Sequence, residues 1–412
     1  MTKSERRVVV TGVGLVSPLG NSKESLWESL AAKRSGVTLL TFDGAERMPV
    51  AFGAAARAFT GEIDDFGPLT KEQKKAIRKG LKLMCRECQM GVAAAQLALA
   101  DAGLEPGMTD SDRCGVAFGM DYLLSEPEEF IAGIKNCRDA RGQFEFPRWG
   151  TDGLTKMSPL WLLKYLPNMP ASHVAIYNDF RGPNNSPTMR ESAADASLGE
   201  AYQIIRRGAA DLMLVGATGS RLHPMKMIHA VGQEEIAGDG GDPAAASRPF
   251  DRDRRGMVLG EGAGAVVLEE LETAQARGAT IYAEVIAAAC CSAIGTRLEA
   301  RRGQAMQNVL QAVLRAAGAE ADDVGHLHAH GLSTRTGDAE EAGAIQRVFA
   351  ARKKPVPVAA AKSYFGNLGA GSGSVELIAS LLALRHNRLF PILNYATPAP
   401  ECPIAAVRDF DT

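Results

Sequence analysis

The most informative absence in the sequence is a gap in its cysteines. The chain has seven cysteines in 412 residues, and none lies between Cys137 and Cys290. An odd number of scattered cysteines does not suit the paired framework of a secreted protein, so we expect reduced thiols and a cytoplasmic location. Cys85 and Cys88 form one CxxC pair, but no second pair completes the ligand set of a structural zinc site.

Long apolar segments, a secretory signal and an excess of one charge are also absent. No apolar run reaches the ~18 residues that a membrane-spanning helix needs, and the N-terminal sequence MTKSERRVVV lacks the apolar core of a signal peptide. The formal net charge is only −2, which argues against bulk nucleic-acid binding. We therefore expect a protein that binds neither membranes nor nucleic acids.

What the chain does contain is a regular alternation of strand and helix patterns. Hydrophobic residues make up 46% of the sequence, enough for large cores and, at this length, two or three domains. Predicted strands lie near residues 7–12, 212–216, 264–268, 281–288, 326–329 and 356–360, and predicted helices near residues 22–32, 70–102, 192–208, 304–317, 339–350 and 372–385. This order indicates layered α/β structure with largely parallel strands. Residues 121–170 are irregular and predict an excursion over the surface.

The segment from Gly182 to Gly199 points to a possible site. A loop rich in Pro and Asn leads into a helix whose apolar residues recur at steps of three and four, and Gly208 provides a stop signal. At the junction of loop and helix, unpaired N–H groups and the helix dipole favour negative charge. Such a junction suits an activated nucleophile, for example a thiolate. The residue found there is Glu191.

Two further motifs involve glycine and histidine. Residues 11–20 resemble a dinucleotide-binding loop, but Pro18 stands where the helix should begin and the glycine spacing is wrong, so we expect no nucleotide cofactor. His326, His328 and His330 alternate along a predicted strand and could share one face. Either they form a metal site, or His330 alone, at the C-terminal end of the strand, is functional.

Two other segments carry lysines. The sequence AKSYFGNLGAGSG brings Lys362 and Asn367 to a glycine-rich turn that could bind a polar group through its N–H groups, or that only makes a tight turn. The helix predicted after Thr70 begins with a basic face made of Lys71, Lys74, Lys75, Arg78, Lys79 and Lys82. That face is either a solvated surface or a landing site for an acidic partner.

Taken in order, these segments resemble the β-ketoacyl-acyl-carrier-protein synthases of fatty-acid and polyketide synthesis, within the thiolase superfamily. The similar stretches are RRVVVTGVGLVSPLG, SPLWLLKYLPNMPASHVAIYNDFRGPN, RPFDRDRRGMVLGEGAGAVVLEE, HAHGLSTRTGDAEE and KSYFGNLGAGSGSVE. The resemblance covers nearly the whole chain. It implies an α/β, thiolase-like, duplicated five-layer αβαβα architecture, with halves at residues 1–255 and 256–412. It also implies a homodimer or heterodimer that acts with acyl carrier protein and needs no cofactor or metal.

The resemblance also assigns site residues. In this family a cysteine takes the acyl chain, and two histidines help to decarboxylate malonyl-carrier protein and stabilise the enolate. The nucleophile position maps to Glu191, the first histidine to His330, the lysine to Lys362 and the second histidine to Asn367, with Glu261 and Asp338 as structural residues near the site. Asn367 can donate a hydrogen bond but cannot carry a charge. The family's final Gly-Phe-Gly-Gly turn, expected after DFDT, is not in this sequence.

The substitution at Glu191 leaves three hypotheses. A carboxylate suits the helix N-terminus as a thiolate does, but an acyl anhydride formed on it would be labile, so condensation should be lost. The favoured hypothesis is a non-condensing subunit, similar to polyketide chain-length factors, that pairs with an active ketosynthase. The second is a malonyl-carrier-protein decarboxylase in which His330 stabilises the enolate, and it is more plausible if burial keeps Glu191 protonated. The third is another acyltransferase chemistry or a structural homodimer.

Overall fold

The computed structural model describes residues 6–42, 44–238 and 241–410. Its strands are β1 (Val8–Val16), β2 (Thr38–Leu39), β3 (Phe52–Gly53), β4 (Cys114–Gly119), β5 (Asn184–Asn185), β6 (Leu212–Ser220), β7 (Glu261–Glu270), β8 (Ala283–Val285), β9 (Leu327–His328), β10 (Pro357–Ala359) and β11 (Ala405–Ala406). Its α-helices are α1 (Lys23–Ala31), α2 (Lys71–Gly80), α3 (Arg86–Asp101), α4 (Glu128–Asn136), α5 (Met169–Asn178), α6 (Ala193–Arg206), α7 (Pro224–Gln233), α8 (Leu271–Ala276), α9 (Arg302–Ala317), α10 (Arg335–Phe349), α11 (Lys362–Phe365) and α12 (Gly371–His386). Within these residues, no helix is both long enough and apolar enough to cross a bilayer.

A six-stranded sheet in the order β5-β4-β6-β7-β1-β8 lies at the centre of the molecule. β4 pairs in parallel with β5 and β6, whereas β7 runs antiparallel to β6 and β1. Every residue of β1, β4, β6 and β7 is buried, as expected for a sheet covered on both faces. Leu214 and Val267 pack in the core with α3, while Val215 and Val266 pack in the core with α6 and α12 on the opposite face.

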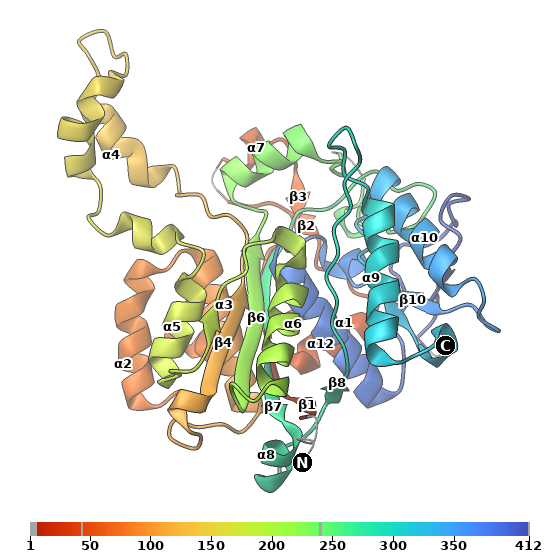
Figure 1. Ribbon diagram of the computed structural model, residues 1–412. Helices are drawn as coiled ribbons and strands as arrows, with labels where there is room; N and C mark the ends of the chain where they lie inside the picture. Colours follow the sequence, from red (N-terminus) through yellow and green to blue (C-terminus); the bar gives the residue numbers. More distant parts are fainter. Residues whose placement is uncertain (1–5, 43, 239–240, 411–412) are drawn as a thin grey trace.

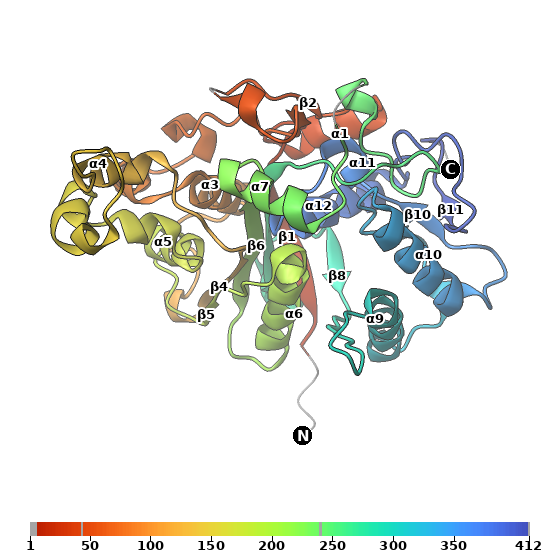
Figure 2. The ribbon, with the colours of Figure 1, turned by 90° about the horizontal axis from the view of Figure 1, so that it is seen from above.

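A second, three-stranded parallel sheet, β11-β10-β9, completes the layers. Ala359 of β10 shares a core with α12, and its neighbour Val358 shares a different core with α10. The layers therefore run from α3 through the large sheet to α6 and α12, then to the small sheet and the outer helices α9 and α10 (Figures 1 and 2). This order confirms the predicted layered α/β architecture. The expectation of largely parallel strands is wrong for the large sheet, in which β6 and β7, β7 and β1, and β1 and β8 pair antiparallel. β7 and β8 lie in the first sheet although they follow residue 255, and the division at residues 255 and 256 stays a prediction.

The single helix predicted over residues 70–102 is wrong, because the structure divides it. α2 begins with a capping box, in which the Thr70 hydroxyl accepts the Gln73 N–H and the Gln73 side chain accepts the Thr70 N–H. A 3-10 turn at Leu81–Leu83 and extended backbone at Met84 and Cys85 then precede α3. The break lets the two helices take different environments: α2 has a basic face in solvent, whereas α3 runs through the core.

Residues 122–168 leave the body of the molecule as a projection, which we call the arm. The arm contains α4 and several short helical turns, and it returns to the body at α5 (Figures 1 and 2). It carries seven exposed large apolar side chains, those of Ile131, Ile134, Phe144, Phe146, Leu154, Leu160 and Leu162. Phe146 is the most exposed of them, at 74%. A solvent-facing apolar surface of this kind is typical of an interaction site.

Candidate functional site

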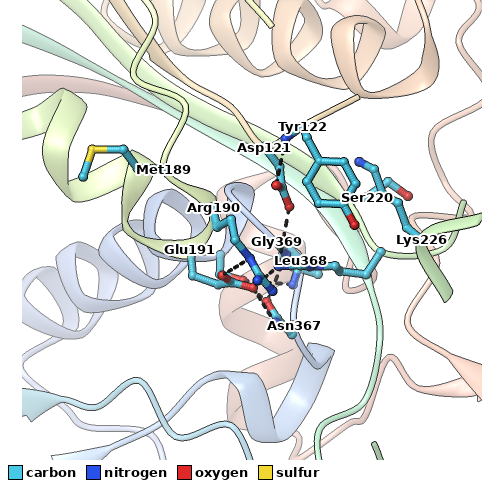
Figure 3. Close-up of polar contacts among 12 residues, drawn as sticks. Asp121, Tyr122, Met189, Arg190, Glu191, Ser220, Lys226, Asn367, Leu368 and Gly369 are labelled. Carbon is cyan, nitrogen blue, oxygen red and sulfur yellow. Dashed lines mark hydrogen bonds and ion pairs between the residues drawn. The ribbon is translucent and has the colours of Figure 1, made fainter. Parts of the chain in front are cut away.

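The residues that the motifs assign to a site come from segments far apart in the chain. Glu191 lies in the 3-10 turn Arg190–Ser192, directly before α6. His330 follows β9, Lys362 begins α11, and Asn367 follows α11. Figure 3 shows Glu191 beside both Arg190 and Asn367, near Gly369 and Asp121. The fold thus brings the loop before α6 and the turn after α11 to one place.

The carboxylate of Glu191 is held by three cationic or amide groups. One of its oxygens, Oε1, bonds to Nη2 of Arg221 and accepts from Nδ2 of Asn367 at 2.9 Å. Nε of Arg190 lies 3.5 Å from the other oxygen. Burial alone would raise the pKa of Glu191, but Arg221, the Asn367 amide and Arg190 together lower it to about 2. Glu191 is therefore ionised at neutral pH, which removes the protonated form considered above.

Arg221 and Asp121 were not predicted from the sequence, but they belong to the cluster of charged groups around Glu191. Arg221 directly follows β6 and is 2% exposed, and Asp121 lies two residues after β4 and is 1% exposed. Nη2 of Arg221 lies 3.5 Å from Oδ2 of Asp121, in addition to its bond with Glu191. A signal was present in the sequence, because each is a charged residue just beyond the C-terminal end of a strand, where α/β sites collect.

A second group surrounds Lys362, which is 1% exposed. Its Nζ lies 3.2 Å from Nδ1 of His330 and 2.5 Å from Oε1 of Glu376. Burial and the charge of Lys362 lower the pKa of His330 to about 3, so the imidazole is neutral. Because the ammonium donates to Nδ1, the ring proton resides on Nε2, which can donate to a substrate oxygen. Glu376, on α12, was not predicted from the sequence.

The amide of Asn367 is oriented by its own turn. Its Oδ1 accepts from the Gly369 N–H at 3.0 Å and from the Ser372 hydroxyl at 3.3 Å, which leaves Nδ2 to face Glu191. The backbone of Asn367 bonds to Val258 and Gly260 at 2.7 and 2.9 Å. The glycine-rich segment is therefore more than a tight turn, because it presents a fixed hydrogen-bond donor to position 191.

His328, in the same HLHAH motif, has a different role from His330. His328 uses Nδ1 with the Ser380 hydroxyl at 2.8 Å and accepts the Ala361 N–H on Nε2 at 3.1 Å. Both of its ring nitrogens thus bond within the protein, and His328 fastens β9 to α11 and α12. In the part of the chain that the structure describes, no group of three or more His, Cys, Asp or Glu side chains is arranged to hold a metal ion.

Glu261 and Asp338 hold the loops around the site. Glu261 forms an ion pair with Arg86 at 2.7 Å and accepts the Ala56 N–H at 3.2 Å. Asp338 accepts backbone N–H groups of Phe250 and Leu332 at 2.8 and 3.0 Å, and burial raises its pKa to about 7. These contacts are with the scaffold around the site, and the structural role that the resemblance assigns to the two residues stays a prediction.

Comparison with known proteins places this geometry in a family. The sequence matches the family described as "Beta-ketoacyl synthase, N-terminal domain" over residues 5–274 and its C-terminal domain over residues 282–396. The chain belongs to the β-ketoacyl synthase family. Its fold is therefore the mixed α/β, thiolase-like fold of the ketosynthases, as the resemblance implied.

Three similar proteins illustrate the range of this family. The curated 3-oxoacyl-[acyl-carrier-protein] synthase 2 of Synechocystis sp. is 32% identical over 400 residues, which span 97% of this chain and 90% of that protein. The crystal structure of a β-ketoacyl synthase from Burkholderia phymatum has a TM-score of 0.83 at 28% identity and covers 98% of this chain and 93% of its own. The ishigamide ketosynthase/chain length factor has a TM-score of 0.77 at 26% identity, covering 99% and 93%.

Proposed function

We propose that the chain is a non-condensing, chain-length-factor-like member of the β-ketoacyl synthase family, which pairs with an active ketosynthase in fatty-acid or polyketide synthesis. The observation that carries the proposal is the ionised carboxylate of Glu191, held by Arg221 and Asn367 at the position of the family's nucleophile. The ion pair and the hydrogen bond occupy lone pairs of the Glu191 carboxylate that would be needed for attack on an acyl group. An anhydride formed there would also be much more labile than a thioester.

The surroundings of Glu191 further disfavour acyl binding. An acyl group attached at position 191 must occupy the space next to Oε1, where Nη2 of Arg221 and Nδ2 of Asn367 now lie within hydrogen-bond distance. Arg221 and its ion-pair partner Asp121 are both almost fully buried. An apolar chain placed against this ion-pair cluster would separate buried charges from their partners, which is costly.

Pairing with a second ketosynthase chain is supported by two surfaces. β5, whose two residues are exposed, is the edge strand of the large sheet, and an open edge offers unpaired backbone groups to another strand. The arm adds its seven exposed apolar side chains. The similar ishigamide structure is named for a ketosynthase and a chain length factor together. An interface formed by β5 and the arm would cover both surfaces.

The basic face of α2 supports a carrier-protein partner. Lys71, Lys74, Lys75 and Arg78 line a surface hollow together with Leu69. Acyl carrier proteins are acidic, and a patch of positive charge steers an acidic partner toward its docking site. The Synechocystis relative is named for its action on acyl-carrier-protein substrates, so we propose the same class of partner for this chain.

The experiment that tests the proposal is an incubation of malonyl-carrier protein with the purified chain, alone and together with a Cys-bearing ketosynthase partner. Mass spectrometry follows the groups on the carrier. We expect no turnover by the chain alone, and a changed product length when it is added to the partner. Condensation by the chain alone would show that the interpretation of Glu191 is wrong.

A second candidate function is decarboxylation of malonyl-carrier protein. It is favoured by the neutral His330, whose Nε2–H can donate a hydrogen bond. Such a donor can stabilise the enolate oxygen that forms when carbon dioxide leaves. The negative charge of Glu191 would destabilise a nearby enolate, but the ion pair of Glu191 with Arg221 offsets this effect. Acetyl-carrier protein made by the chain alone, and lost in His330→Ala, would establish this function instead.

A further inference from the structure

The CxxC pair, which the proposed function does not use, lies at the first turn of α3. Cys85 is the N-cap residue of this helix, and Cys88 stands three residues further along. Both are free thiols, and their Sγ atoms are 3.5 Å apart. Cys85 is partly exposed, whereas Cys88 is completely buried. Of the two residues only Cys85 has solvent-exposed surface, so a small reagent would approach the pair from the side of Cys85.

The backbone at this turn favours closure of the pair. Side chains at the N-cap and at the third helical position lie on the same side of a helix start, which is why capping boxes join these two positions. A disulfide needs its sulfurs ~2.05 Å apart, so the two sulfurs need to approach by only ~1.5 Å. Cys290 and Cys291, by contrast, are adjacent in the sequence and lie in a surface loop.

We propose that Cys85 and Cys88 form a dithiol modification site, which is oxidised to an intramolecular disulfide by exchange with a small disulfide such as glutathione disulfide. The Cys85 thiolate attacks one sulfur of the reagent, forms a mixed disulfide and releases one small thiol. The Cys88 thiolate then attacks Sγ of Cys85 and releases the second small thiol. The two protein thiols lose two electrons, the reagent gains them, and the two protons end on the released thiols.

The surroundings of the pair set how fast this exchange runs. The hydrogen bond with Cys88 and burial raise the pKa of Cys85, so little thiolate is present at neutral pH. Below the pKa of a thiol, the thiolate fraction grows tenfold for each pH unit. We therefore expect slow oxidation at neutral pH, and a rate that rises by close to tenfold per unit toward alkaline pH.

The site also lies at a junction of the fold. Arg86 and Glu87, between the two cysteines, bind Glu261 on β7 and Lys226 on α7 at 2.7 and 3.1 Å. Sγ of Cys88 lies 3.8 Å from the carbonyl oxygen of Lys164 at the base of the arm. The disulfide would therefore form at the turn where α3, α7, β7 and the arm meet, and it would fix the first turn of α3.

The test uses the full chain in glutathione redox buffers, with acid quenching, alkylation and trypsin. Cleavage after Arg86 separates the two cysteines into the peptides of residues 83–86 and 87–113. These peptides stay joined only if the Cys85–Cys88 disulfide has formed. We expect the joined pair to appear in the oxidising buffers, to vanish after reduction, and to form about tenfold faster per pH unit.

Two variants make the outcome decisive. In Cys88→Ser, which removes the resolving thiol, one glutathione should remain attached to Cys85. In the matched control Cys291→Ser, the joined peptides should form as in the unchanged protein. If the peptides never join while Cys290 becomes modified, or if Cys88→Ser takes up no glutathione at Cys85, the proposed site is wrong. Circular dichroism of each variant verifies that it is folded.

Discussion

Among single residues, Arg221 has the most unusual surroundings. Its guanidinium is 2% exposed and shares Nη2 between Glu191 and Asp121. A buried cation with two carboxylates is costly to form but more costly to break, because removal of one member leaves an uncompensated charge in the interior. The cluster therefore ties the identity of residue 191 to that of residue 221.

We predict that Arg221→Met lowers the free energy of unfolding by about 3–5 kcal/mol, since it leaves Glu191 and Asp121 buried without their shared cation. Glu191→Gln should lower the free energy of unfolding by less, because Arg221 keeps its ion pair with Asp121. Urea denaturation measures both. The matched control is Arg252→Met, which breaks the exposed 3.3 Å pair with Asp253 and should change the value by less than about 1 kcal/mol. An Arg221→Met effect as small as that of the control would contradict the role given to the cluster.

The ionisation of Glu191 predicts a pH dependence. Its pKa in the folded protein is about 2, below the ordinary value of 4.5. A carboxyl whose pKa is lowered by folding contributes stability that is complete above its ordinary pKa and is lost as the pH falls toward the folded value. The difference in unfolding free energy between the unchanged protein and Glu191→Gln should therefore shrink from about pH 5 to about pH 3. A difference that stays constant over this range would mean that Glu191 is not held ionised.

Some residues of the site could be predicted from the sequence, and others could not. Glu191, His330, Lys362 and Asn367 stand in ordered motifs, so each could be named by its place in a motif. Arg221, Asp121 and Glu376 could not, because their importance comes from contacts between residues far apart in the sequence. Arg221 bonds to Glu191 across 30 residues, Asp121 lies 3.5 Å from Arg221 across 100 residues, and Glu376 bonds to Lys362 across 14 residues. A single sequence carries little information on which distant charges become partners.

At the scale of elements, local signals predicted helix starts better than helix continuity. The helix starts predicted near residues 22 and 70 were correct, because Ser22 and Thr70 cap these helices and a cap depends on neighbours three residues away. The break between α2 and α3 was missed, because both segments have helical periodicity and only their packing differs. α2 meets the body through a few residues such as Ile77, whereas α3 is buried almost all round.

The exposed face of α2 gives the prediction at this scale. Charge reversal in Lys74→Glu and Lys75→Glu should slow association with an acidic carrier protein by at least tenfold at low salt, because steering depends on the local potential. Stopped-flow fluorescence with a labelled carrier measures the rate. The control is Lys353→Glu with Lys354→Glu, an exposed lysine pair beyond α10. Equal rates for the two double variants would remove the α2 face from the proposed docking site.

At the scale of the whole molecule, the cores between the layers are closed, but the edge strand β5 and the arm remain exposed. The cores on both faces of the large sheet are closed by α3, α6 and α12. The arm extends from this body (Figure 1). The side chains of Phe144, Phe146 and Leu162 on the arm are exposed to solvent. The layered order followed from the alternation of strands and helices, whereas the path of the arm could not be predicted from residues that lack any periodic pattern.

The arm provides a test of assembly that is independent of catalysis. Phe146 is 74% exposed, so Phe146→Asp should leave the stability of the separate chain within about 0.5 kcal/mol of its original value. If the arm packs against a second ketosynthase chain, the same change places a charge in an apolar interface and should weaken association by tenfold or more. Sedimentation velocity, with the chain alone and with a Cys-bearing ketosynthase, measures both assemblies. Leu298→Asp is the matched control, because Leu298 is 81% exposed and lies in the loop before α9, outside the arm. Association that survives Phe146→Asp but is lost in Leu298→Asp would move the interface away from the arm and toward the second half of the chain.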